Sequence, residues 1–84
     1  MNIAEVIPKE RYTLLVRADD GRSGIFDVAP YLEAEAFEPL KDEKEFEKVR
    51  NGGYFVEWEC GADLSSDTIE AKWHIAAERS EYSV

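Results

Sequence analysis

The sequence predicts a small α+β fold, in which an antiparallel β-meander of about three N-terminal strands and one or two later strands packs with two or three short helices. Two alternating β-type segments flank an Asp-Gly pair in the first third of the chain, and a helix-start motif follows near its middle. The length of 84 residues is that of one domain. We therefore expect residues 1–84 to form a single domain, with residues 80–84 as a frayed tail.

The first three strands are predicted from alternation and turn chemistry. Residues 3–7 form an apolar segment that Pro8 ends, which is typical of an edge strand because proline cannot donate to a ladder. In residues 12–18 one side of the strand is apolar, and it carries Tyr12, Leu14, Val16 and Ala18. The Asp20-Gly21 pair precedes a return strand at residues 23–28, and it predicts a hairpin because this tight turn needs positive φ.

Short helices are predicted in the middle of the chain. Pro30 favours the start of a helical turn, and residues 31–36 form a short helix after it. Asp42 with Glu45 three residues later makes a capping box at the start of a second helix. We expect residues 51–53, Asn-Gly-Gly, to end that helix.

The last third of the chain predicts a strand, a short strand and a helix. Residues 54–60 alternate, and the side chains expected to face inward are Tyr54, Val56, Trp58 and Cys60. A short strand is expected at residues 62–64, and Ser65 or Ser66 is expected to cap a final helix. The apolar stripe expected on that helix comprises Ile69, Trp73, Ala76 and Ala77.

Charge and composition disfavour several classes of function. The net charge of −9 disfavours direct binding to nucleic acid or to an anionic membrane, since both need clustered cations. The sequence contains no bilayer-spanning apolar segment and no signal peptide, so we expect a cytoplasmic location. One cysteine and one histidine cannot form a disulfide or a zinc site, and no cofactor or metal is expected.

The acidic second half of the chain supplies the candidate binding residues. Residues 51–84 hold seven carboxylates against two cations. This excess either serves solubility alone or forms a docking surface for a basic protein, which its field would steer. The expected partner surface comprises Glu57, Glu59, Asp63, Asp67 and Glu70.

Catalytic and metal-binding interpretations are weaker. The segment from Asp63 to Asp67 spaces oxygen ligands two apart, but it lacks the glycine and final glutamate of a calcium loop, so helix capping is the favoured role. Cys60 is expected to be a buried structural thiol, and His74 a surface or packing residue. An enzyme would have to assemble its site from Asp27 together with Asp63 and Asp67.

A set of residues spread over most of the chain points to a family. It comprises the Asp20-Gly21 hairpin, the Phe26-Asp27-Val28 strand before Pro30, and then Phe37, Pro39, Leu40, Asp42, Phe46, Val49, Val56, Trp58, Gly61, Asp63, Leu64, Ser65 and Asp67. In this order and spacing, across residues 2–70, the chain resembles the bacterial family known as domain of unknown function 2442. The segment from Gly61 to Ser65 carries most of the resemblance.

The resemblance implies a small α+β protein without established catalytic residues. Some members carry a helix-turn-helix after this domain, and others are encoded beside another small protein in proposed toxin–antitoxin pairs. Taken with the charge, it leads to the hypothesis of a non-catalytic module that binds a small basic protein, in its sharper form as an antitoxin-like partner. The alternative is a sensor domain of a transcription regulator that lacks its own helix-turn-helix. Small size and abundant aromatic residues also predict a homodimer.

Overall fold

The α+β fold is confirmed by the computed structural model, which describes residues 1–75. A four-stranded antiparallel sheet has the order β1-β2-β3-β7 and is built from β1 (Ile3–Lys9), β2 (Thr13–Ala18), β3 (Ser23–Asp27) and β7 (His74–Ile75). A three-stranded antiparallel sheet has the order β4-β5-β6 and is built from β4 (Arg50–Asn51), β5 (Phe55–Glu57) and β6 (Asp63–Ser65). The helices are α1 (Glu43–Phe46) and α2 (Ser66–Lys72), with 3₁₀ turns η1 (Glu10–Tyr12), η2 (Ala29–Glu33) and η3 (Glu35–Lys41).

The β2–β3 hairpin forms as predicted. Gly21 takes φ 98°, which the turn requires, and the Ala18 N–H donates to the Arg22 carbonyl at 2.8 Å. Along β2 the predicted apolar side is buried at Leu14, Val16 and Ala18, while Tyr12 lies in η1 and is half-buried.

Strand β1 is an edge strand, as predicted, but Pro8 does not end it. β2 uses its even-numbered residues to bond β3, as the Ala18–Arg22 bond shows, so its odd-numbered residues bond β1. Pro8 is paired with Leu14 and therefore points its nitrogen away from β2, where no ladder donor is needed. At the other end of β1 the Ile3 N–H donates to the Gly53 carbonyl at 2.7 Å and connects the two sheets.

The middle of the chain differs from the prediction in its helix lengths. The turns η2 and η3 replace the single helix expected at residues 31–36. Asp42 caps α1 as predicted and accepts from the Lys44 N–H at 3.0 Å. The capping box is not completed, because the Asp42 N–H donates to the Pro39 carbonyl and the Glu45 side chain bonds Lys48. Helix α1 also ends at Phe46 and not at the glycines. The chain extends after it because Arg50 pairs with Glu57 in the second sheet.

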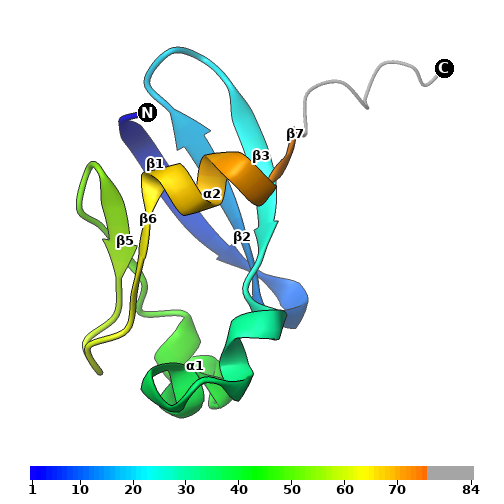
Figure 1. Cartoon of the computed structure of the whole chain (residues 1–84), viewed down its shortest axis with the longest axis vertical. Helices are drawn as coiled ribbons and strands as arrows, with labels where there is room; N and C mark the ends of the chain where they lie inside the picture. The colour runs from blue at the N-terminus through cyan, green and yellow to red at the C-terminus, as the bar shows by residue number, and fades with distance from the viewer. Residues whose placement is uncertain (76–84) are drawn as a thin grey trace, which may run out of the picture.

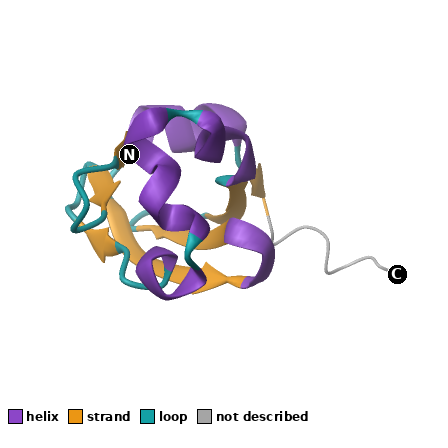
Figure 2. Ribbon diagram, turned by 90° about the horizontal axis from the view of Figure 1, so that it is seen from below, coloured by secondary structure: helices purple, strands orange, loops and turns teal. Residues whose placement is uncertain are grey.

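Figure 1 shows α2 crossing the large sheet, while the turns around α1 lie at the far end of the molecule from the β2–β3 hairpin. In Figure 2, which views the molecule from the end that carries α1, the helix and the turns around it lie over the strands. Between the layers sits a core whose largest fully buried side chains include Trp58, Phe26, Phe46 and Leu14. An aromatic series runs through it from Phe26 by way of Tyr31 and Phe37 to Trp58, with ring centroids 5.7 to 6.0 Å apart.

Two predictions of inward-facing residues in the last third were wrong. Tyr54 is 68% exposed and Cys60 is exposed, because β5 covers only three residues and the chain turns at both of its ends. Val56 and Trp58 are buried as predicted.

The C-terminal helix is shorter than the predicted apolar stripe requires. Ser65 caps α2 and accepts from the Thr68 N–H at 3.1 Å, as expected. However, α2 ends at Lys72, so Trp73 leaves the helix, and the next two residues pair with β3 as β7. The other stripe residues, Ala76 and Ala77, and the tail at residues 80–84 lie outside the described residues.

Candidate functional site

The five predicted partner-surface carboxylates lie on the second sheet and α2. Glu57 and Asp63 are directly opposite each other on β5 and β6. Glu59 is exposed in the turn that joins these strands, and Asp67 is exposed in the first turn of α2, where its charge favours the helix. These four carboxylates therefore follow one continuous stretch of chain from β5 into α2.

The fifth carboxylate, Glu70, is held by contacts within the chain. Its Oε2 lies 2.9 Å from Nη1 of Arg22, and its Oε1 lies 3.5 Å from the Met1 amino group. The hydrogen bond from Arg22 holds the pKa of Glu70 below its usual value of 4.5. Arg22 also binds Asp20 at 2.9 Å and lies 5.7 Å from the Trp73 ring centre. Glu70 thus ties α2 to the hairpin.

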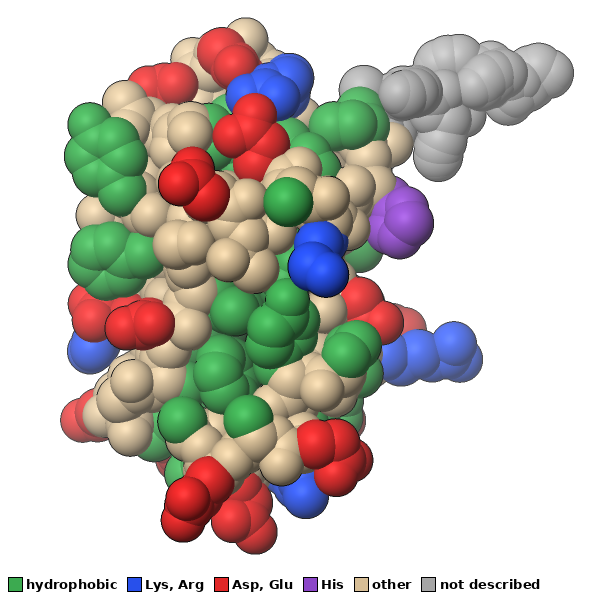
Figure 3. All heavy atoms as spheres, in the orientation of Figure 1, with side chains coloured by type: hydrophobic (Ala, Val, Ile, Leu, Met, Phe, Trp, Pro, Cys, Tyr) green, Lys and Arg blue, Asp and Glu red, His purple; other side chains and the backbone are tan. Residues whose placement is uncertain are grey.

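One surface combines acidic and exposed aromatic side chains. By register, Phe55, Glu57, Asp63 and Ser65 share the outward side of β5 and β6, whereas Val56 and Leu64 are buried on the other side. Phe55 is 37% exposed, and the adjacent Tyr54 is 68% exposed. Figure 3 shows hydrophobic side chains at the edge of the molecule along which β5 runs, with acidic side chains next to them. We call Phe55, Glu57, Asp63 and Ser65 the β5–β6 outer face; the exposed Tyr54 directly precedes it in the chain.

The exposure of Tyr54 differs from the prediction, which places this side chain in the core. A signal was present: the Gly52-Gly53 pair directly before Tyr54 favours a turn, and an alternating pattern does not extend through a turn. The ring of Phe55 packs against Gly52, where a Cβ would clash with the ring atoms.

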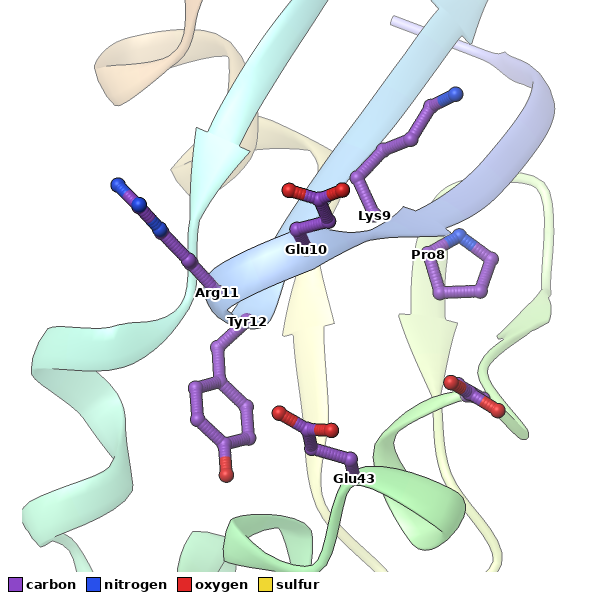
Figure 4. Close-up of a pocket in the computed structure, with 7 residues that line it drawn as sticks. Pro8, Lys9, Glu10, Arg11, Tyr12 and Glu43 are labelled. Atoms are coloured by element: carbon purple, nitrogen blue, oxygen red, sulfur yellow. The ribbon is translucent and has the colours of Figure 1, made fainter.

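A cavity of about 460 Å³ lies beside η1, lined by Pro8, Lys9, Glu10, Arg11, Tyr12, Glu43 and Glu47. Arg11 and Tyr12 both have φ 60°, an uncommon conformation for residues other than glycine. It places the Tyr12 ring edge-on to Phe46 and lets its hydroxyl donate to the Lys41 carbonyl. In Figure 4, Lys9 and Arg11 extend away from Glu43. The charged side chains that line the cavity therefore do not converge on one point.

A second hollow, of about 360 Å³, lies between β3, η2 and the end of α2. Its lining is Phe26, Asp27, Pro30, Tyr31 and Lys72. Figure 3 shows hydrophobic side chains gathered on this face below α2. The Asp27 carboxylate accepts from the N–H of Ala29, the first residue of η2, at 3.0 Å.

The three aspartates considered for an enzyme have separate surroundings. Asp27 lines the hollow below α2, Asp63 faces Glu57 across the strands, and Asp67 lies in the first turn of α2. Within residues 1–75, no three His, Cys, Asp or Glu side chains are placed to hold a metal ion. None of the helices in this part of the chain is long and apolar enough to cross a membrane.

A family model described as "Protein of unknown function (DUF2442)" matches residues 3–74. The chain belongs to this family. No curated protein and no solved structure matches it. The part shared with DUF2442 runs from the first residue of β1 to the first residue of β7, so it includes β1 to β6, α2 and the whole β5–β6 outer face.

Proposed function

We propose that this DUF2442 chain is a non-catalytic interaction module of the cytoplasm that binds a small, basic protein, as an antitoxin-like partner would. The observation that carries the proposal is the placement of four carboxylates, Glu57, Glu59, Asp63 and Asp67, in one stretch that also exposes Tyr54 and Phe55. Solubility alone explains exposed carboxylates, but it does not explain exposed aromatic rings beside them, since exposed rings promote association.

Charge supports a basic partner. Residues 50–67 carry the four carboxylates against one cation, Arg50, which lies 3.9 Å from Glu57. The net charge of the whole chain is −9, so its field attracts cationic surfaces and repels nucleic acid and anionic lipid. Aromatic rings within such a surface supply the apolar contact area on which binding energy usually concentrates.

The test is purification of the tagged full chain from its host at low ionic strength. We expect one stoichiometric protein of high isoelectric point, and a complex that reforms from the two pure proteins. Its affinity should fall as salt rises, because exposed charges at the interface are screened. An acidic partner, or an affinity that salt does not change, would contradict the proposal.

A further inference from the structure

We propose that the β5–β6 outer face binds an arginine side chain of the basic partner, with the guanidinium stacked on the exposed ring of Phe55 and paired with Asp63. This inference rests on the proposed function and assigns its contact point. Three features of the face carry it: a carboxylate placed at a cost to the fold, a supported aromatic ring beside it, and a geometry that suits a planar cation.

The first feature is the cross-strand pair of Glu57 and Asp63. Like charges directly opposite each other in an antiparallel pair destabilise a sheet. Arg50 lies beside Glu57 and offsets part of that charge, but Asp63 on the open edge strand β6 gains no such contact from it. A residue that breaks a local stability rule without a compensating structural gain is expected at a functional site.

The second feature is the ring of Phe55. It lies on the same side of the sheet as Asp63, in the diagonal position relative to it, and such diagonal neighbours are within reach of long side chains. Packing against Gly52 holds the ring in place, so little side-chain freedom is lost on binding. Tyr54, directly before β5, is a second exposed aromatic side chain.

The third feature is chemical fit. A guanidinium stacks on an aromatic face and donates two parallel hydrogen bonds to a carboxylate, whereas an ammonium lacks the planar fork. Other occupants fit the charge less well. A second copy of the chain would bring the same carboxylates face to face. Residues 76–84 of this chain carry two glutamates and one arginine, so they have a net negative charge and suit an acidic face less well than a basic partner does.

The experiment is an NMR titration of the ¹⁵N-labelled full chain with a short glycine peptide that carries two arginines. Matched peptides contain lysine or the neutral isostere citrulline in place of arginine. The protein variants are Asp63→Lys, Phe55→Ser and Glu33→Lys. The last makes the same charge change at an exposed carboxylate of η2, outside the face.

We expect the arginine peptide to shift the amide signals of Phe55, Glu57 and Asp63. Asp63→Lys should weaken its binding about tenfold, and Phe55→Ser about threefold. Glu33→Lys should stay within about twofold, since it changes only the long-range field. The lysine peptide should bind about threefold more weakly than the arginine peptide, and the citrulline peptide should leave the spectrum unchanged.

Urea unfolding of Asp63→Lys shows whether weaker binding comes from loss of the contact or from loss of the folded structure. The substitution turns a like-charged cross-strand pair into an opposite-charged one, so its midpoint should rise while its binding falls. Two results would overturn this contact point and leave the interaction module standing. One is a set of peptide-induced shifts on η2, η3 and α1. The other is an Asp63→Lys variant that binds the peptide and the natural partner as well as wild type does. Binding at Phe55 and Asp63 without any natural protein partner would instead uphold the arginine site and refute the proposed function.

Discussion

The indole N–H of Trp58 donates to the main-chain carbonyl of Phe46 at 2.8 Å, and the two rings stack 5.9 Å apart. Trp58 directly follows β5, and Phe46 ends α1, so this contact joins the second sheet to the helical end of the molecule. Both side chains are 2% exposed. The hydrogen bond satisfies a carbonyl at a helix end that is shielded from water.

Trp58→Phe is therefore expected to destabilise the fold by about 2–4 kcal/mol, because it leaves that carbonyl without a donor and opens a cavity where the larger ring was. Urea unfolding followed by far-UV circular dichroism measures the change. Trp73→Phe is the matched control: Trp73 is half-buried, so the same substitution should cost clearly less there. Equal losses for the two variants would contradict the role assigned to Trp58.

Gly24 is expected to tolerate no side chain. A Cβ at this position would lie 2.8 Å from the Trp73 ring and 2.9 Å from the His74 carbonyl, so Gly24→Ala must push β7 away from β3. We expect a loss of about 1–3 kcal/mol and a displaced Trp73 indole signal in the NMR spectrum. Gly53→Ala serves as the control, because the space there is open and its φ of 92° alone should cost about 1 kcal/mol without moving that signal. An unmoved Trp73 signal in Gly24→Ala would refute the close packing.

Arg11 is exposed and has φ 60° and ψ 37°, the left-handed region that glycine adopts without a Cβ penalty. Arg11→Gly is expected to stabilise the protein by up to about 1 kcal/mol, because relief of the strain exceeds the added freedom of the unfolded chain. Arg17→Gly, within β2, should destabilise it by about 1 kcal/mol, since there glycine weakens a strand and removes the contact of Arg17 with Glu5. Thermal unfolding of both variants tests the difference in sign, and a loss of stability in both would count against strain at η1.

Acid should weaken the contact between Glu70 and Arg22. The pKa of Glu70 is lower in the folded protein than its usual 4.5, so its carboxylate contributes stability above that value and loses the contribution as the pH falls through the folded-state pKa. Glu70→Gln lacks this contribution at every pH. The melting temperature of the variant should therefore lie below that of wild type at neutral pH, and the gap should close well below pH 4.5. Glu33→Gln should show no such pH-dependent gap; a gap for Glu70→Gln that persists in acid would exclude the carboxylate as its cause.

Local signals predicted the parts of the fold that depend on neighbouring residues. The Asp20-Gly21 turn, the buried side of β2 and the Asp42 and Ser65 caps all follow from a few adjacent side chains. The end of α1 does not. Its position depends on the pairing of Arg50 with Glu57, which a pattern of apolar residues does not reveal.

The candidate site was predicted in composition but not in geometry. The acidic residues were found, yet the sequence could not place Asp63 opposite Glu57, since this register is set by the turn in which Gly61 takes φ 102°. It also did not separate Glu70 from the others, because the partner of Glu70 is Arg22, which is distant in sequence. Tyr54 is exposed because β5 is shorter than alternation alone predicts.

The position of Pro8 affects the tendency of these molecules to aggregate through the edge of the large sheet. An unprotected edge strand is a template on which another chain can align, and such alignment is the first step of β-type aggregation. Along the free side of β1, the Ile3 N–H is already occupied by Gly53, and Pro8 has no N–H to offer. That edge therefore recruits further strands poorly, which protects the molecule from extension of the large sheet along β1.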